Sequence, residues 1–309
     1  MTVVFYRAEM SVRTNSFSPS SDKPRQAVHD WLTHPDLEGK RPTIKSFEPV
    51  TADQLKDVHT ADYVDGVLEG KLANGFGNRN PAVAEACRYT VGSFLAASRF
   101  SWETKENACS PTSGFHHAGH DFGGGFCTFN GLALAALRLL IGPGNDRNRI
   151  LILDLDQHAG NGTRNILTCL KNGDCAGKFD TVKHFSAGEH PLRDWSDVSG
   201  FIHDAFEKSE PQIVLYQAGA DMHRDDPLGG ILNSCGMYAR DRLVFRLAAE
   251  RKVPVAWNLA GGYQTDSDGS IEPVLSIHRK TYLASMEFTS ERSEDQERHP
   301  HSVADSSLR

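Results

Sequence analysis

Apolar and polar positions follow two patterns that alternate along the chain. Short continuous apolar runs are typical of strands buried on both faces, and apolar residues three or four positions apart are typical of helices. The first pattern predicts strands over 2–6, 107–110, 150–155, 179–185, 212–217 and 253–259. The second predicts a helix from about 21, a short helix capped by Thr51, helices over 60–68, 81–100, 130–140 and 161–170, one around Ala205, and helices over 233–252 and 270–286.

Strands that alternate with helices predict an α/β fold, a single domain with a mostly parallel sheet flanked by helices on both faces. Residues 35–50 show neither pattern and are expected to be irregular. Residues 289–309 lack core-forming side chains. We therefore expect one domain over residues 1–288, followed by a disordered C-terminal tail.

The composition narrows the class of protein. Of the 309 residues, 39% are hydrophobic and 24% charged, as in ordinary globular domains. The formal charge of −7 argues against direct nucleic-acid binding, which requires a basic surface. The sequence has no run of 18 apolar residues that would cross a membrane, and its six cysteines include no CxxC pair, as is typical of reduced thiols. We therefore expect a cytoplasmic protein without membrane contact, and the sequence does not indicate an oligomeric state.

The stretch over 150–163, ILILDLDQHAGNGT, combines a buried strand with unusual polar residues. Asp154, Asp156 and His158 occupy alternate positions after its apolar run. Alternate residues of an extended chain point to the same side, so Asp156 and His158 can reach one metal ion together. The stretch taken alone fits equally well a strand that ends on a structural carboxylate before a capped helix.

Four other polar or glycine-rich segments lie close after predicted strands. They are GFHHA (114–118), GGGFC (123–127), GADMHRDDPLGG (219–230) and AGGYQ (260–264). Ligands of open parallel sheets bind beyond the carboxyl ends of the strands, so we expect these segments to meet at one edge of the sheet. Each also has an ordinary interpretation: packing histidines, a flexible glycine loop, a solvated acidic loop and a turn that exposes a tyrosine.

Taken together, the five motifs resemble those of the zinc-dependent histone deacetylase family, with its acetylpolyamine amidohydrolase relatives and the arginase/deacetylase fold. The resemblance covers about 88–283 in the correct order. The stretch over 240–264 and GGGFC look most like the class IV branch, whereas DDPLGG is more like class II. The resemblance implies a hydrolase that removes an acetyl or longer acyl group from a lysine-like amine by means of a metal-activated water.

The resemblance also assigns roles to particular residues. It implies three zinc ligands, Asp156, His158 and Asp226, and Fe²⁺ is the alternative metal for such an oxygen-rich set. It implies three catalytic residues: the general base and acid His117, its electrostatic partner His116, and the oxyanion donor Tyr263. Two residues would orient the histidines, Asp154 toward His116 and Asn161 toward His117. Gly125 and Phe126 would form a wall of the acyl-lysine channel.

The chain departs from the family pattern at three places. Ser110–Gly114 replaces the usual Arg-Pro-Pro-Gly, so the arginine of the acetate-release path is missing. Where family members place a serine that helps bind a monovalent cation, this chain has Val182 or Lys183. The presence of a K⁺ site is therefore undecided. A lysine ammonium could replace the ion. Across the channel from Phe126 the alignment places His190, which would make the channel more polar, unless it and Glu189 face solvent.

Three other functions compete with lysine deacylation. Acetylpolyamine or other small-molecule amide hydrolysis is one, although Ala260 stands where polyamine-selective relatives carry an acidic gatekeeper. An inactive module that binds acylated ligands is another, but such a module would not need the catalytic residues that are all present here. An arginase-like dimanganese hydrolase would need further ligands after His158, where Gly160 and Asn161 stand instead. The expected partner is therefore an acylated lysine peptide or protein, or an acylated small amine.

Overall fold

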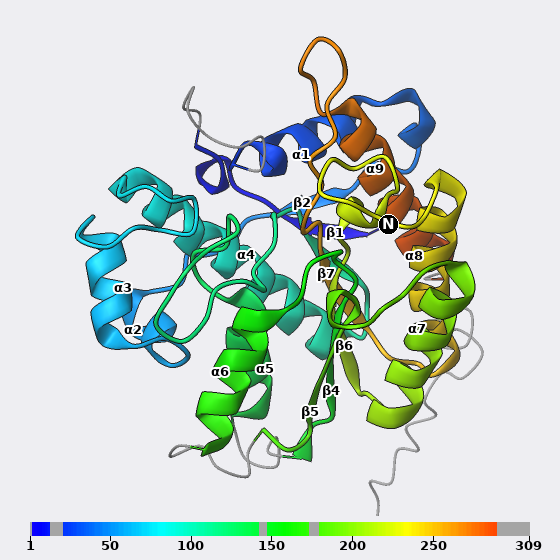
Figure 1. The fold of residues 1–309 in the computed structure, drawn as a ribbon. Coiled ribbons are helices and arrows are strands. Elements are labelled where there is room, and N and C mark those ends of the chain that lie inside the picture. Colours follow the sequence, from blue (N-terminus) through cyan, green and yellow to red (C-terminus); the bar gives the residue numbers. More distant parts are fainter. Residues whose placement is uncertain (1, 13–20, 142–146, 173–178, 289–309) are drawn as a thin grey trace, which may run out of the picture.

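A parallel β-sheet forms the centre of the molecule (Figure 1). The computed structural model describes residues 2–12, 21–141, 147–172 and 179–288. Seven strands lie in the order β2-β1-β3-β7-β6-β4-β5, and every pairing is parallel. Their bounds are Val3–Phe5 (β1), Thr43–Lys45 (β2), Ala108–Ser110 (β3), Ile150–Asp154 (β4), Val182–Ser186 (β5), Ile213–Gln217 (β6) and Val255–Asn258 (β7). The prediction of a single α/β domain with a parallel sheet is confirmed.

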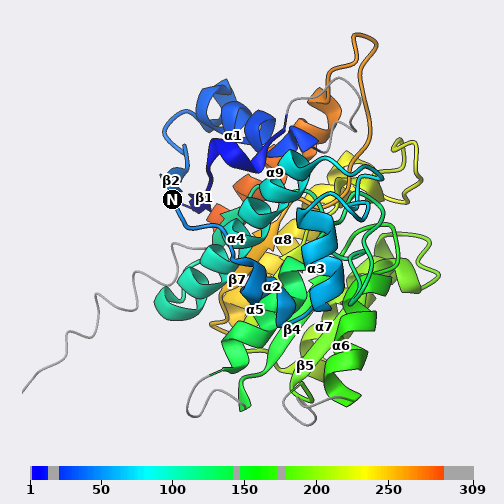
Figure 2. The same ribbon diagram turned by 90° about the vertical axis from the view of Figure 1, so that its left-hand side faces the viewer.

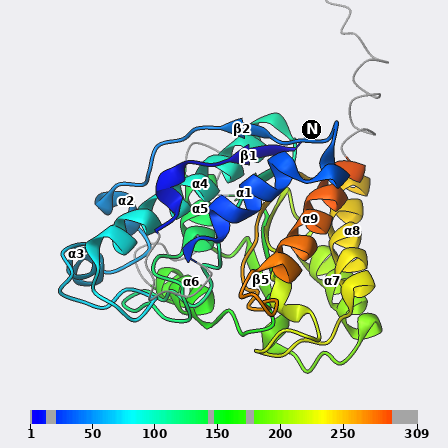
Figure 3. The same cartoon turned by 90° about the horizontal axis from the view of Figure 1, so that it is seen from above.

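Helices cover both faces of this sheet, as Figures 1 and 2 show. One face carries α1 (Lys23–Thr33), α7 (Trp195–Ser209), α8 (Ser234–Glu250) and α9 (Glu272–Glu287). The other carries α2 (Ala52–Lys56), α3 (Ala61–Leu68), α4 (Pro81–Thr104), α5 (Gly131–Leu140) and α6 (Asn161–Asn172). Figure 3 shows α1 beside α9 and α9 beside α8.

The central strand β4 explains why its sequence is apolar without alternation. Leu151 and Leu153 pack into the hydrophobic cluster on the α8 side, and Ile150 and Ile152 pack into the cluster on the α5 side. Successive side chains of a strand point to opposite faces, so a strand covered on both faces needs apolar residues at every position. The continuous apolar run therefore predicted this strand correctly.

One strand was missed. Residues 35–50, expected to be irregular, contain β2 and a short 3₁₀ turn over Pro35–Leu37. All three residues of β2 are exposed, and the strand pairs with β1 at the edge of the sheet. An edge strand that buries no face has no periodic apolar pattern, so its pairing cannot be recognised from local sequence.

The predicted helices are present with small shifts of their ends. The capping box of Thr51 and Gln54 is formed, with Gln54 N donating to Thr51 Oγ1 at 3.1 Å and Thr51 N donating to Gln54 Oε1 at 2.8 Å. Helix α4 continues to Thr104, past the predicted end at 100. The predicted tail, 289–309, lies outside the described residues. None of the helices within the described residues is long and apolar enough to cross a membrane.

Candidate metal centre

Four neighbouring strands deliver the polar segments to one edge of the sheet. In the strand order, β3, β7, β6 and β4 are adjacent, and a polar segment that the sequence singled out follows each of them. The rings of His117 and His158 have centroids 6.0 Å apart, and those of His158 and Tyr263 are 6.5 Å apart. Segments more than 100 residues apart in the chain thus meet at the carboxyl ends of the central strands, as expected for this type of sheet.

Asp156, His158 and Asp221 form a group whose ligand atoms lie within 4.8 Å of one another. Nδ1 of His158 is 3.0 Å from Oδ1 of Asp156 and 3.1 Å from Oδ2 of Asp221. Both aspartates are buried, with exposed fractions of 1% and 0%. One imidazole and two carboxylates are a donor set that Zn²⁺ accepts at catalytic sites, and Fe²⁺ is compatible with it as well.

The charges of the two buried carboxylates also favour a cation. Burial and the charge of Asp156 raise the pKa of Asp221. Although burial opposes it, the positive charge of His116 and a hydrogen bond from His158 lower the pKa of Asp156. A divalent ion between the two carboxylates would remove the repulsion and let both ionise, so the residues present fit a metal.

The backbone comes unusually close to these carboxylates. A Cβ atom on Gly261 would lie 2.1 Å from Oδ2 of Asp221 and 2.7 Å from Oδ2 of Asp156. No side chain fits at those distances, so the position requires glycine. The amide of Gly261 donates to Oδ2 of Asp156 at 2.9 Å. The AGGY motif therefore contacts the candidate metal-binding group through the Gly261 amide and also supplies Tyr263.

Asp226, which the sequence analysis assigned as the third ligand, is not in this group. Its Oδ2 accepts the amide of Tyr263 at 2.8 Å and its Oδ1 accepts the amide of Leu228 at 3.0 Å. Backbone amides also donate to both oxygens of Asp156, so these bonds do not decide between Asp221 and Asp226, and Asp226 stays a predicted ligand. Asp221, which the sequence analysis did not assign as a ligand, lies four residues after Gln217 at the end of β6, whereas Asp226 lies nine residues after it. Proximity to the strand end is the signal that indicates Asp221 as a second candidate for the third ligand.

Each of the tandem histidines contacts the partner that the resemblance implied. Nδ1 of His116 lies 2.8 Å from Oδ2 of Asp154, and Nδ1 of His117 lies 2.6 Å from Oδ1 of Asn161. Asp154 is fully buried at the end of β4, and Oδ1 of this residue also accepts a hydrogen bond from Gln217 at 3.0 Å. Because an amide oxygen only accepts, Nδ1 of His117 carries the proton and Nε2 retains a lone pair.

The two histidines differ in charge. Burial lowers the pKa of His116, but Asp154 and Asp156 outweigh it and raise this pKa to about 9. Burial and the neighbouring charge of His116 lower the pKa of His117. The surroundings therefore favour the charged form of His116 and the neutral form of His117, whose ring centroids lie 4.1 Å apart.

A tight turn over 124–127 forms a wall beside the histidines. The amide of Cys127 donates to the carbonyl of Gly124 at 2.8 Å, and Gly125 and Phe126 both have positive φ, at 52° and 63°. These are the features of a type I′ turn. The Phe126 ring packs 5.7 Å from Tyr263 and 5.8 Å from Phe76. Gly125 and Phe126 thus lie next to the centre, where the resemblance implied the channel wall.

His190 and Lys183 have other surroundings than the resemblance suggested. His190 is exposed and packs on Phe201 at 5.0 Å, and Glu189 pairs with Arg164 at 2.6 Å, so the alternative in which both face solvent describes them. Lys183 is exposed. It is His184 whose Nε2 lies 3.9 Å from Oδ2 of Asp154. A K⁺ site beside Asp154 stays undecided, as in the sequence analysis.

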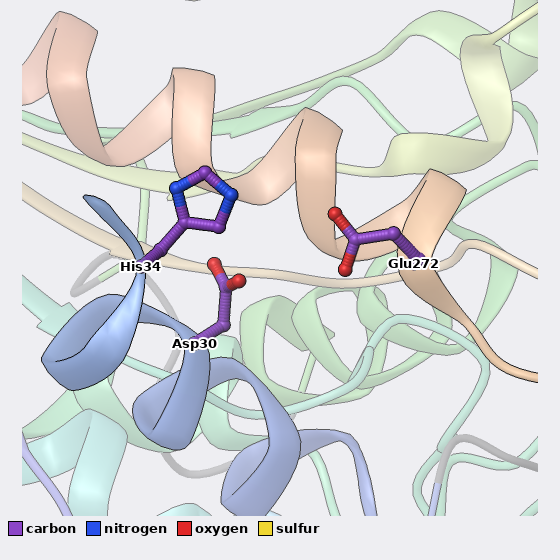
Figure 4. A group of neighbouring side chains, drawn as sticks. All are labelled: Asp30, His34 and Glu272. Carbon is purple, nitrogen blue, oxygen red and sulfur yellow. The ribbon is translucent and has the colours of Figure 1, made fainter. Parts of the chain in front are cut away.

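A second group of potential ligands lies between α1 and α9. Figure 4 shows Asp30 and His34 at the end of α1 facing Glu272 at the start of α9. Arg279 donates to both oxygens of Asp30, at 2.9 and 2.6 Å, and to Glu272 at 2.8 Å. A guanidinium therefore already pairs with both carboxylates, and the group is an ion-pair cluster that joins two helices.

A parallel sheet with one histidine and two carboxylates at its carboxyl edge is the arrangement of a metal-dependent α/β hydrolase. The model of the histone deacetylase domain matches residues 18–187 and 195–272, which is most of the chain. The chain therefore belongs to the histone deacetylase family, which includes the acetylpolyamine amidohydrolases.

Individual relatives agree with this assignment. The chain is 30% identical over 253 residues to an uncharacterized protein of Picosynechococcus, covering 75% of this chain and 83% of that protein. It is 30% identical over 200 residues to histone deacetylase 2 of Arabidopsis thaliana, covering 58% of this chain and 50% of that protein. The fold superimposes on an acetylpolyamine aminohydrolase of Burkholderia pseudomallei with a TM-score of 0.68 at 17% identity, covering 92% and 98% of the two chains.

Proposed function

We propose that this protein is a zinc-dependent amidohydrolase that removes an acetyl or longer acyl group from a lysine-like amine. One observation carries the proposal: the group of Asp156, His158 and Asp221 lies beside the tandem histidines and the ring of Tyr263. These are the parts that metal-assisted amide hydrolysis requires. Asp156, His158 and Asp221 would hold the metal, with Fe²⁺ as the alternative to Zn²⁺.

The chain's own residues supply the proton transfers. Bound Zn²⁺ would lower the pKa of a water from about 16 to about 7 and polarise the amide carbonyl. Nε2 of His117 has the free lone pair that accepts a proton from the attacking water, and the same atom then gives it to the leaving amine. The His116 imidazolium, paired with Asp154, stabilises the negative charge that develops.

Tyr263 completes the site as a hydrogen-bond donor. Burial and the nearby carboxylates raise the pKa of Tyr263 well above its usual range. The hydroxyl therefore stays protonated and can donate a hydrogen bond to the developing oxyanion. The amide of Tyr263 donates to Asp226, so in this proposal Asp226 positions the tyrosine, and it is the alternative to Asp221 as the third ligand.

The surroundings of the centre support an alkyl-amine substrate. Phe126 presents its ring next to Tyr263 and Phe76 packs against Phe126, and such an aromatic wall suits the methylene chain of an acylated lysine. Ala260 is apolar where an acidic gatekeeper would favour a polyamine, so we place acylated lysine peptides or proteins before acetylpolyamines. We also propose that the chain belongs to the class IV-like branch of the family, because GGGFC and residues 240–264 look most like that branch.

A hydrolysis panel tests the proposal. Metal-stripped enzyme is assayed with and without added Zn²⁺ on acetyl-lysine and long-chain acyl-lysine peptides, N-acetylputrescine and N-acetylspermidine. We expect zinc-restored turnover of the peptides, and the preferred chain length identifies the acyl group. Preference for the small amines would move the protein to the polyamine group. Stoichiometric zinc without turnover of any member would contradict the proposal and favour a binding module.

A further inference from the structure

Lys23 is a buried cation that the proposed mechanism does not use. It is the first residue of α1, and its exposed fraction is 0%. Its Nζ donates to the carbonyl oxygen of Ala260 at 2.7 Å, across 237 residues of sequence. Within the described residues Lys23 forms no ion pair. Burying an ammonium is costly unless the surroundings compensate its charge, so this position requires an explanation.

The compensation comes from the metal-binding segment. Burial lowers the pKa of Lys23 to about 8, while the carboxylates of Asp221, Asp156 and Asp226 act in the opposite direction. Burial, and after it the charges of Lys23 and of the buried Arg240, lower the pKa of the buried His278. Arg240 is committed to Asp241 and to the carbonyls of Leu155 and Gly219. Lys23 therefore lies in the field of the centre's carboxylates without pairing to any of them.

Ala260, the acceptor of this hydrogen bond, begins a strained turn. It has a φ of 56°, a left-handed conformation that a residue with a Cβ rarely adopts, and Gly262 follows with a φ of 142°. The amide of Ala260 is held by the carbonyl of Thr112 at 3.2 Å, and its carbonyl by Lys23 at 2.7 Å. The two bonds hold both sides of the strained residue.

The backbone of this turn is hydrogen-bonded to the carboxylates of the candidate metal centre. The amide of Gly261 donates to Asp156, its carbonyl accepts the amide of Ala220 at 2.8 Å, and the amide of Tyr263 donates to Asp226. A shift of the Ala260 carbonyl would therefore move a hydrogen bond to a metal ligand and the backbone of the oxyanion donor together.

We propose that Lys23 is a positioning residue of the metal centre, whose buried ammonium holds the Ala260 carbonyl and so keeps Tyr263 in place. The catalytic part of this inference rests on the proposed function. Its structural part, the holding of the turn, does not.

Amide hydrogen exchange tests the structural part without any substrate. Lys23→Met removes the donor and the charge, and we expect amides within 259–264 to exchange about tenfold faster or more, as for a lost hydrogen bond to a charged group. Lys23→Arg should restore protection. Arg25→Met, which removes a cation from the same helical turn at the surface, is the matched control and should leave exchange unchanged. Unchanged exchange in Lys23→Met, or a change spread over α1 and the sheet, would overturn the inference.

Kinetics test the catalytic part. We expect Lys23→Met to lower kcat about tenfold or more with KM near the wild-type value, because misplacement of an oxyanion donor acts on the transition state. The same substitution in a Tyr263→Phe background should have little further effect, and additive losses would show that Lys23 does not act through Tyr263.

Two further outcomes keep the experiment decisive. If Lys23→Met does not fold, Lys23→Gln, which keeps a donor without the charge, takes its place, and faster exchange confined to 259–264 is again expected. If zinc-loaded wild-type enzyme turns over no member of the panel, the proposed function fails, and the exchange measurement alone decides the role of Lys23.

Discussion

Two clusters in this molecule contain the same side chains, one histidine and two carboxylates, within reach of one metal ion. One is the group of Asp156, His158 and Asp221 at the edge of the sheet, and the other is the group of Asp30, His34 and Glu272 between α1 and α9. In the second cluster Arg279 donates to both carboxylates. In the first the two carboxylates meet at the histidine, with no arginine or lysine among their ion-pair partners in the described parts of the chain.

Burial separates the two clusters as well. Both aspartates of the sheet-edge cluster are almost fully buried, whereas in the second cluster Asp30 is buried but the Glu272 side chain is 50% exposed. The two histidine side chains are similarly exposed, at 32% for His158 and 28% for His34. Nδ1 of His34 accepts the amide of Asp36, so a backbone contact already occupies that ligand atom. Ligand spacing alone therefore does not make a metal site. The compensating charge determines whether a cation is needed, and the substitutions below test this difference.

The largest effect should come from Asp221→Asn. This change removes a charged ligand from the sheet-edge cluster, so we expect loss of stoichiometric zinc and a fall in turnover of more than about 10³-fold, because the acidity of the attacking water depends on the metal. Metal analysis and the deacylation assay measure both. Asp225→Asn, at an exposed position of the same loop, is the control and should retain both.

Asp226→Asn separates the two assignments of the third ligand. If Asp226 holds the amide of Tyr263, the variant keeps its zinc and loses about tenfold in turnover, the cost typical of a residue that orients an active group. Loss of zinc in Asp226→Asn together with retention in Asp221→Asn would restore the assignment made from sequence.

Tyr263→Phe tests the chemistry beside the same cluster. We expect kcat to fall about 10²–10³-fold, because one oxyanion donor is removed. Zinc content and the free energy of unfolding should stay near the wild-type values, since the proposed ligands are Asp156, His158 and Asp221. Near-normal turnover would contradict the role of Tyr263 as a donor.

Arg279→Met tests the second cluster. It leaves the buried carboxylate of Asp30 without its partner, so we expect the free energy of unfolding to fall by about 3 kcal/mol. Zinc content and kcat should not change. Denaturant unfolding measures the loss, and Lys208→Met, which breaks an exposed pair with Asp204, should cost less than about 1 kcal/mol. Zinc loss in Arg279→Met would overturn the view that this cluster is structural.

The alternation of apolar patterns was sufficient to predict the parallel sheet and six of its seven strands. Burial on two faces demands apolar residues at every position of β4, and burial on one face demands helical spacing in α4 and α8, so local sequence carries this information. The same local reasoning missed β2, whose exposed residues gain their pairing from β1 alone.

The candidate site divides in the same way. That the polar segments meet at one edge follows from strand order and parallel direction, and the contacts of His116 with Asp154 and of His117 with Asn161 match the resemblance. The resemblance assigned Asp226 as the third ligand, whereas Asp221 is the aspartate of this loop that contacts His158. The three aspartates of the loop have the same chemistry, and the path of the 3₁₀ turn over Ala220–Met222 determines which of them lies near His158.

Contacts between distant segments were beyond the reach of any local pattern. The bond from Lys23 to Ala260 joins residues 237 positions apart, and nothing near a lysine at a helix start indicates that its ammonium will be buried. Local periodicity reports which face of an element is covered. Which buried charge lies beside which carbonyl depends on how the finished helices pack on the sheet, and that packing exists only in three dimensions.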